Sequence, residues 1–299
     1  MKLSGLHLLM TYQCLLECEH CFVWGSPTQW GTMTSAAIRQ ILAQAGDVKS
    51  LEWIYFEGGE PFLYYATLLE GVQLAARSGF HTGIVSNGYW ATSFEDAYAA
   101  LKPFQSLVKD LSISSDLFHW DEAISRQAEY ALAAAERLEI PAGIISIAGL
   151  ESLSGYQPMG KLESGESQVM FRGRAAVKLA PRAPQITWDS FTTCPYEDLI
   201  EPGRLHLDPN GNLHICQGIC IGNLFERPLR DIVESYEPQT HPITGPLLER
   251  GPMGLVLKYQ VPHRDTYADA CHLCYETRLA LRDLFAILLA PDPIYGAGL

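Results

Sequence analysis

Short apolar segments alternate with stretches of helical periodicity through the first half of the chain, and this alternation restricts the fold more than any other feature. The apolar segments are 6–12, 51–56, 82–86, 107–115 and 142–149. Strands separated by helices form βαβ units, in which successive strands pair in parallel. We therefore expect an α/β fold whose parallel sheet curves into a full or partial TIM-like barrel.

Prolines interrupt this pattern, and we place a domain boundary near residue 185. Behind the boundary, 204–216 reads as two alternating strands around an Asp-Pro-Asn-Gly turn, which predicts a β-hairpin. The periodicity of 121–139 and of 275–289 predicts two further helices. The sequence thus predicts a large domain over residues 1–185 and a small α+β domain over residues 186–299.

Charge and composition exclude several classes of partner. The formal net charge is −13, whereas nucleic-acid binding relies on clustered Lys and Arg. No apolar run is long enough to cross a bilayer, and the N-terminus lacks a signal-peptide cleavage site. We expect a cytoplasmic protein without nucleic-acid or membrane partners. Thiols stay reduced in that compartment, so clustered cysteines favour metal binding over disulfides.

Three of the eight cysteines, Cys14, Cys18 and Cys21, fall at the spacing C-x3-C-x2-C. Eight cysteines placed at random would give this spacing about once in two hundred such chains, so the spacing is a signal. A structural zinc site needs four ligands, and here His20 or a distant residue would have to be the fourth. A [4Fe–4S] cluster on three thiolates instead keeps one iron open for a substrate or cofactor.

This spacing resembles the hallmark of the radical SAM superfamily, C-x3-C-x-aromatic-C, with His20 in the aromatic slot. A second motif follows the second expected strand and consists of Gly58, Gly59, Glu60 and Pro61. It is similar to the motif with which that family holds the methionyl amino group of S-adenosylmethionine (SAM). Glycines lack Cβ, so backbone carbonyls at such a strand end approach an ammonium group closely.

The resemblance implies a partial (β/α)6 TIM-like radical SAM barrel over residues 1–185. It also implies a [4Fe–4S] cluster whose open iron chelates SAM. Reductive cleavage of SAM would give a 5′-deoxyadenosyl radical that abstracts hydrogen from an unactivated carbon of the substrate. A one-electron donor such as flavodoxin or ferredoxin would be a partner.

Polar residues near later strand ends are further candidates. The resemblance implies contacts with SAM from the ends of the third and fourth strands, by Ser86, Asn87, Ser112 and Ser114. The alternative is that these residues make ordinary βα turns. Arg172 and Arg174 would pair with the SAM carboxylate, or else would end a solvated helix.

Lone acidic and histidine side chains complete the candidates in the barrel. Asp116 and His119 follow the fourth strand and are candidate catalytic groups that would accept a proton, with a solvated loop as the alternative. Glu57 precedes the paired glycines, is unusual there in similar proteins, and would touch the substrate. We interpret His206 and His214, on the expected hairpin, as packing or surface residues.

The remaining cysteines lie behind the boundary and resemble a SPASM/twitch domain. In such a domain, a cysteine before a G-x4-C hairpin and a later C-x2-C hold an auxiliary [4Fe–4S] cluster. The ligands that this resemblance implies are Cys194, Cys216, Cys271 and Cys274. The alternative is a structural zinc ribbon. Cys220 is left over, as a spare thiol, an alternative ligand or a catalytic residue.

These features predict a radical SAM oxidoreductase. A closed auxiliary cluster would serve as an electron conduit or sink, which favours net oxidation, by dehydrogenation or cross-linking, of a small molecule or a peptide. One alternative is a peptide maturase that epimerises residues or forms thioether or C–C bonds on a ribosomal peptide. Another is a non-catalytic zinc or iron–sulfur protein. Cys14 lies thirteen residues behind the start of the sequence, so we expect no fused leader-binding domain.

Overall fold

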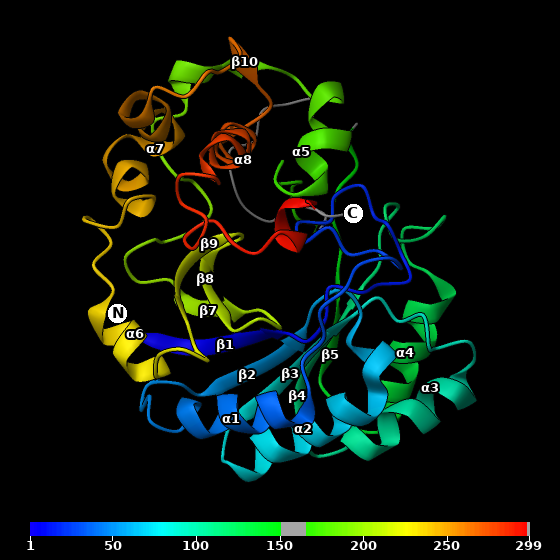
Figure 1. The fold of residues 1–299 in the computed structure, drawn as a ribbon. Helices are drawn as coiled ribbons and strands as arrows, with labels where there is room; N and C mark the ends of the chain where they lie inside the picture. The colour runs from blue at the N-terminus through cyan, green and yellow to red at the C-terminus, as the bar shows by residue number, and fades with distance from the viewer. Residues whose placement is uncertain (151–165, 298–299) are drawn as a thin grey trace.

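The computed structural model describes residues 1–150 and 166–297, and one mixed sheet organises it (Figure 1). Its eight strands lie in the order β5-β4-β3-β2-β1-β7-β8-β9. The strands are β1 (Leu3–Leu9), β2 (Trp53–Glu57), β3 (His81–Ser86), β4 (Val108–Ser114), β5 (Ala142–Ile145), β7 (Gly203–Leu207), β8 (Asn212–Cys216) and β9 (Ile219–Asn223). Strands β1 to β5 and β7 pair in parallel, whereas β8 and β9 are antiparallel. The expected α/β fold with a mostly parallel sheet is confirmed.

Among the described residues, four helices cover the outer face of this sheet, and the others lie elsewhere. Those on the outer face are α1 (Ser35–Ala45), α2 (Tyr65–Arg77), α3 (Phe94–Leu101) and α4 (Arg126–Arg137). Figure 1 shows the others across the opposite face or beyond its edge: α5 (Arg174–Lys178), α6 (Leu229–Ser235), α7 (Thr244–Tyr259) and α8 (Ala270–Leu281). A two-stranded sheet joins β6 (Ile186–Thr187) to β10 (Thr266–Tyr267). Within the described part of the chain, no helix combines the length and the apolar character needed to cross a membrane.

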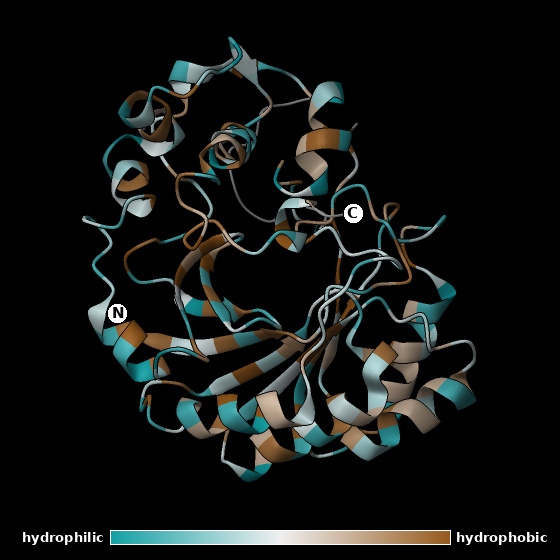
Figure 2. Cartoon of the chain, viewed as in Figure 1, coloured by the Kyte–Doolittle hydropathy of each residue, from teal (hydrophilic) through white to brown (hydrophobic). Residues whose placement is uncertain are grey.

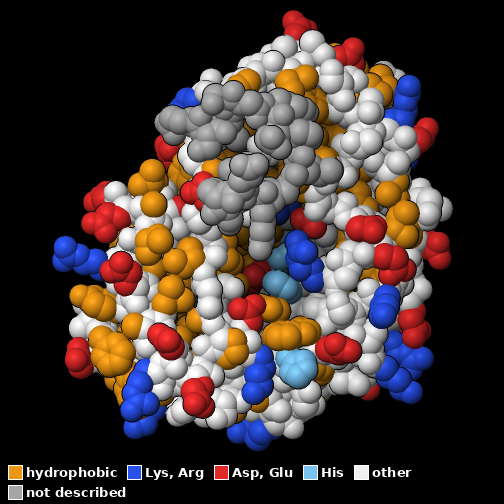
Figure 3. All heavy atoms as spheres, turned by 180° about the vertical axis from the view of Figure 1, so that it is seen from behind, with side chains coloured by type: hydrophobic (Ala, Val, Ile, Leu, Met, Phe, Trp, Pro, Cys, Tyr) orange, Lys and Arg blue, Asp and Glu red, His pale blue; other side chains and the backbone are white. Residues whose placement is uncertain are grey.

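Alternation along the strands separates a helix-covered face from an inner face. Leu6 and Leu8 on β1 are fully buried, as are Ile54 and Phe56 on β2. Residues between them point to the opposite side because side chains alternate along a strand. Figure 2 shows this alternation of hydrophobic and hydrophilic residues along the strands. Seen from behind, Figure 3 shows histidine and charged side chains gathered in a hollow of the molecular surface.

Two expected helices have different bounds. The helix expected over 121–139 is α4, which begins at Arg126 because the Ser125 hydroxyl caps it by accepting from the Ala128 N–H. The helix expected over 275–289 is α8, which begins five residues earlier because Asp269 caps it. It ends at Leu281, and of the apolar residues behind it Leu284 and Ile287 are exposed whereas Leu289 is fully buried.

The first strand begins and ends earlier in the sequence than expected, and this affects the site. The segment expected to be a strand over 6–12 is β1, which ends at Leu9. Beyond it, the backbone instead hydrogen-bonds the turn behind β2 on its way into the cysteine loop. Strand β5 ends at Ile145, before the expected residue 149.

The hairpin expected over 204–216 is β7 and β8, but it extends the large sheet. Strand β7 pairs in parallel with β1, and His206 is the register partner of His7. The sixth parallel strand among the described residues is thus β7, which lies behind residue 185 and on the far side of β1. The division into residues 1–185 and 186–299 stays a prediction, and the sheet runs across it without interruption.

Candidate active site

The loop behind β1 holds the three clustered cysteines, and we call residues 14–26 the cluster loop. Its ends are joined by a hydrogen bond of 3.0 Å from the Cys14 N–H to the Ser26 carbonyl. Cys14 and Cys18 are buried, and Cys21 is half-buried. Backbone N–H groups of Leu16 and Gly25 point at the sulfurs of Cys14 and Cys21, at 3.4 and 3.2 Å. Such donors stabilise thiolates, which suits metal ligands.

The paired glycines bring the end of β2 against this loop. The Gly59 N–H donates to the Thr11 carbonyl at 2.7 Å, and the Glu60 N–H donates to the Gln13 carbonyl at 2.8 Å. A Cβ on Gly59 would overlap the backbone of Gln13, and one on Gly58 would lie 2.5 Å from the Thr11 oxygen. Gly58 also has a φ of +143°, which side chains rarely adopt. Glycine at both positions therefore lets the motif lie beside the first cysteine.

Glu60 ties the motif to the next strand. Its buried carboxylate accepts from the Phe62 N–H at 3.0 Å, the Ser86 hydroxyl at 2.9 Å and the Asn87 N–H at 2.8 Å. Burial raises the pKa of Glu60 to about 7, although these hydrogen bonds oppose the shift. Pro61 is buried as well and begins the 3-10 turn Pro61–Tyr64. Glu60 and Ser86 are both predicted to contact SAM. In the structure their side chains hydrogen-bond each other and so join the end of β2 to the end of β3.

Asn87 is the strand-end residue that reaches the cysteines. Its Nδ2 lies 3.6 Å from the sulfur of Cys14, and its Oδ1 accepts from the Tyr89 N–H. On the next strand, Ser112 and Ser114 are half-buried, and the Ser112 hydroxyl donates to Asp110 at 3.3 Å. The ends of β3 and β4 therefore lie at the same edge of the sheet as the cluster loop, as expected for the carboxyl ends of parallel strands.

Arg174 braces the cluster loop from behind. Its guanidinium donates to the carbonyls of Cys18 at 2.9 Å and Gly25 at 2.7 Å. The preceding Gly173 has a φ of +60°, and a Cβ there would lie 2.6 Å from the Phe22 backbone. Arg174 is 5% exposed, so the solvated helix end is wrong. The sequence predicts that Arg174 pairs with the SAM carboxylate, whereas in the structure its N–H donors bind two backbone carbonyls.

His20, Asp116 and His119 form a compact group beside the cluster loop. Asp116 is 2% exposed, and its carboxylate accepts from His119 Nδ1 at 2.8 Å and lies 3.6 Å from His20 Nε2. Although burial opposes it, hydrogen bonds from the two histidines hold the pKa of Asp116 well below its ordinary value. The His20 ring also stacks on Phe118 at 4.9 Å. The Asp116 carboxylate is therefore buried and not solvated, and it lies beside the histidine in the aromatic slot.

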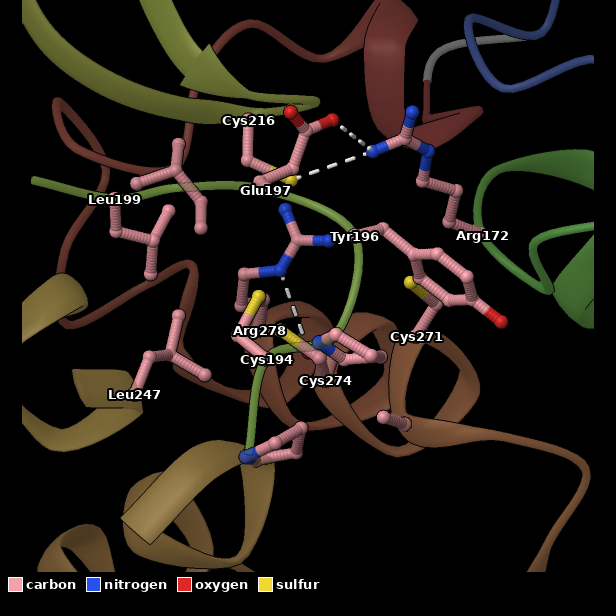
Figure 4. A pocket seen from close by; sticks show the side chains of 14 residues that line it. Arg172, Cys194, Tyr196, Glu197, Leu199, Cys216, Leu247, Cys271, Cys274 and Arg278 are labelled. Atoms are coloured by element: carbon pink, nitrogen blue, oxygen red, sulfur yellow. Dashed lines mark hydrogen bonds and ion pairs between the residues drawn. The ribbon is translucent and has the colours of Figure 1, made fainter. Parts of the chain in front are cut away.

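The four cysteines implied as auxiliary ligands lie together. They line one pocket, into which Figure 4 shows side chains projecting from several elements: Cys194, Cys216, Cys271 and Cys274. Strand β8 ends at Cys216, and Cys271 and Cys274 lie on the first turns of α8. The structure thus brings together residues that are separated by up to eighty positions in the sequence.

Two buried guanidinium groups line the same pocket. Arg172 donates to the Cys216 sulfur at 3.4 Å and to Glu197 at 3.2 Å, and it is 7% exposed. Its burial shows that a solvated helix end is wrong for Arg172, whereas its pairing with the SAM carboxylate stays a prediction. Arg278, which the sequence analysis missed, is 1% exposed and donates to the Cys274 carbonyl at 3.3 Å. The sequence offered one indication of this contact, because residues four apart on a helix, such as Cys274 and Arg278, lie side by side.

The spacing of the sulfurs bears on the two metals considered for these cysteines. Thiolates around one zinc ion lie about 3.8 Å apart, given Zn–S distances of about 2.3 Å. Among the described residues, no three cysteine sulfurs lie within 4.8 Å of one another. In each set, at least one pair of sulfurs is therefore farther apart than two thiolates on one zinc ion.

Cys220 lies apart from the pocket-lining cysteines. It is buried on β9, where its thiol donates to the Ala290 carbonyl at 3.3 Å and lies 3.5 Å from His214 Nδ1. His214 is fully buried, and its Nε2 lies 3.2 Å from Asp208. A surface position for His214 is therefore wrong, and both residues belong to a buried polar network of the hairpin.

The two cysteine sets are joined through the cluster loop. Trp24 Nε1 donates to the hydroxyl of Tyr275, which follows Cys274 on α8, at 2.9 Å. The Phe22 ring lies 5.4 Å from the guanidinium of Arg172. Aromatic residues directly behind Cys21 therefore connect the first cysteine set to the second pocket.

Comparisons with known proteins agree with this arrangement. Residues 8–151 match the family model of the radical SAM superfamily. The putative peptide biosynthesis protein YydG of Bacillus subtilis (strain 168) is 32% identical over 108 residues, which are 36% of this chain and 34% of that protein. The aligned segment thus spans about a third of that relative.

Solved structures resemble the fold over most of the chain. BtrN in complex with AdoMet and 2-DOIA gives a TM-score of 0.52 at 14% identity, over 84% of this chain and 89% of that one. Streptococcus suis SuiB bound to S-adenosylmethionine gives 0.52 at 15% identity, over 81% and 68%. The anSMEcpe structure with AdoMet and the Cp18Cys peptide gives 0.51 at 12% identity, over 96% and 97%. Together with the family match, the cysteine spacing and the glycine motif identify residues 8–151 as a domain of the radical SAM superfamily, whose members are SAM-dependent iron–sulfur enzymes.

Proposed function

We propose that this chain is a radical SAM oxidoreductase that carries two [4Fe–4S] clusters and modifies a peptide. The observation that carries the proposal is the cluster loop, which holds three thiols beside the glycine motif with N–H donors on two sulfurs. When bound, the cluster and SAM supply a 5′-deoxyadenosyl radical that abstracts a hydrogen atom from the substrate.

The chain's own residues would position these groups. The thiolates of Cys14, Cys18 and Cys21 would hold one cluster and leave one iron for SAM. The backbone at Gly58 and Gly59 would receive the methionyl ammonium, because no Cβ shields the carbonyls there. His20, which lies 3.6 Å from the Asp116 carboxylate, would contact SAM from the cluster loop.

The second pocket would hold an auxiliary cluster on Cys194, Cys216, Cys271 and Cys274. Support comes from the sulfur spacing and from the guanidinium groups of Arg172 and Arg278, whose positive charge offsets that of buried thiolates. Four thiolates would close this cluster to substrate. It would then take up the electron that a substrate radical releases on net oxidation, and its link to the cluster loop through Tyr275 fits that role.

A peptide substrate is favoured by the relatives' descriptions. The 32%-identical relative is described as a putative peptide biosynthesis protein, and one structure with the same fold was solved with a peptide bound. We infer dehydrogenation or cross-linking as the outcome, with epimerisation as the redox-neutral alternative. Mass spectrometry separates these outcomes, because oxidation removes two hydrogens from the peptide whereas epimerisation leaves its mass unchanged.

Anaerobic reconstitution tests the enzyme class. Iron and sulfide would be counted, dithionite and SAM added, and 5′-deoxyadenosine measured. We expect about eight irons per chain, and about four with no deoxyadenosine in a variant with Cys14, Cys18 and Cys21 changed to Ala. Zinc in place of iron, with SAM intact, would overturn the proposal and favour a metal-stapled binding protein.

A further inference from the structure

Three polar side chains meet on the inner face of the sheet, and none of them is a cysteine. His7 lies on β1 between the buried Leu6 and Leu8, so alternation turns its ring to the opposite face. His206 is its register partner on β7. Glu57 is the last residue of β2, the neighbour of β1 on the other side. The group therefore stands on three adjacent, parallel strands, which form a rigid platform.

The ligand atoms of this group are close together. His7 Nδ1 lies 3.1 Å from Glu57 Oε2, and His206 Nε2 lies 3.3 Å from Glu57 Oε1. One nitrogen or oxygen from each of the three residues falls within 4.8 Å of the other two. The side chains of His7, Glu57 and His206 are 16%, 13% and 18% exposed, so each of them is largely but not fully buried.

One oxygen of this group lacks the partner that a buried carboxylate needs. Oε1 of Glu57 is buried, and its contact with His206 lacks hydrogen-bond geometry, so it has no hydrogen-bond partner among the described residues. A buried acceptor without a partner is costly. A cation between this oxygen and the two imidazoles would satisfy it.

Neighbouring side chains hold the histidine rings in place. Tyr55 stacks on His7 with ring centroids 4.5 Å apart, and its hydroxyl donates to Asp110 at 2.8 Å. Phe22, directly behind Cys21, meets the ring of His206 edge-on. Such outer contacts orient metal-binding histidines. Arg204, on the same face of β7, pairs with Glu197, so its charge is partly offset.

We propose that His7, Glu57 and His206 bind one divalent transition-metal ion on the inner face of the sheet. Two imidazoles and one carboxylate form a ligand set that divalent first-row metals accept, and three protein ligands leave coordination positions open. The atom separations of 3.1 and 3.3 Å match those of ligands about 2.1 Å from one metal ion. The open positions would take an oxygen or nitrogen of a bound molecule. This site is additional to the proposed clusters and uses none of their ligands.

Manganese binding to the cluster-loaded protein tests the site. Mn²⁺ prefers nitrogen and oxygen ligands over thiolates, and its free signal in electron paramagnetic resonance gives the bound fraction in a titration. We expect one saturable site per chain that Zn²⁺ displaces. Glu57→Gln and His206→Ala should each weaken binding at least about tenfold.

Two control variants separate this site from other histidines. His81→Ala removes a histidine from β3, outside the group, and should leave Mn²⁺ binding unchanged. His119→Ala disrupts the other compact histidine–carboxylate group and should also leave it unchanged. Iron content and circular dichroism of each variant would show that the fold and clusters persist. No saturable Mn²⁺ binding at millimolar concentration, or a loss that follows His119 in place of His206, would overturn the proposal.

Discussion

At the residue scale, the site depends on the close approach of two backbone segments as much as on the cysteine thiols. Gly58 and Gly59 allow the end of β2 to lie against Thr11 and Gln13, directly before Cys14. Arg174 then fixes the far part of the cluster loop by holding two of its carbonyls. Both contacts are sensitive to single substitutions, because the neighbouring atoms belong to the backbone and have little room to move.

Gly59→Ala should damage SAM binding. The new Cβ would overlap the Gln13 backbone and displace the motif, at a cost of about 1–3 kcal/mol in stability. We expect SAM affinity, measured by equilibrium dialysis, to fall at least about tenfold while the iron content stays near that of the wild type. Gly143→Ala is the matched control, since a Cβ there meets no atom within 4 Å. Equal SAM affinity in the two variants would contradict this explanation.

Arg174→Met should weaken the first cluster selectively. The substitution leaves the buried Cys18 and Gly25 carbonyls without their donors, each at a cost of about 1–3 kcal/mol. We expect the iron content to fall from about eight toward about four per chain, because the auxiliary ligands are untouched. Arg182→Met removes only an exposed pair with Glu19 and should leave the iron content unchanged.

At the element scale, the ends of parallel strands are joined by one buried carboxylate. Glu60 follows β2, yet its hydrogen bonds go to Ser86 and Asn87 at the end of β3. Asn87 in turn reaches the sulfur of Cys14 behind β1. The relative positions of three strands at the site thus depend on Glu60.

The free energy of unfolding should depend on pH through the titration of Glu60. Its pKa rises from 4.5 in the unfolded chain to about 7 in the folded protein, mainly through burial. Between these values the folded state retains a proton that the unfolded state has lost. This contribution is therefore complete below pH 4.5 and is lost as the pH rises through 7, by up to about 3 kcal/mol.

The measurement is the thermal midpoint of the wild type and Glu60→Gln, compared from about pH 5 to about pH 8. The difference between the two proteins should change over this range, because glutamine does not titrate. A constant difference would mean that Glu60 has an ordinary pKa in the folded protein.

At the scale of the whole molecule, the sheet joins the two halves of the sequence. Strand β7 covers the edge of β1, and its Leu205 and Leu207 are fully buried. The Trp24–Tyr275 hydrogen bond makes a second connection, between the cluster loop and α8. Residues on both sides of position 185 thus complete one structure around both cysteine sets.

A chain of residues 1–185 alone should not fold stably. It would expose the edge of β1 and the apolar surface that β7 covers, and such edges promote aggregation. We expect low soluble yield and no cooperative unfolding in circular dichroism, whereas the chain of residues 1–299 unfolds cooperatively. A soluble fragment with a sharp transition would establish an independent domain that ends near residue 185.

The sequence by itself determined the cysteine spacing, the glycine motif and the alternation of strands and helices, because each is a local pattern set by near neighbours in the chain. It therefore predicted the α/β fold and the cluster loop behind the first strand. It could not place Arg172 against Cys216, bury Arg278, or bring His7, Glu57 and His206 together. These contacts join distant segments, and only the pairing of β7 with β1 and the packing of α8 decided which side chains meet.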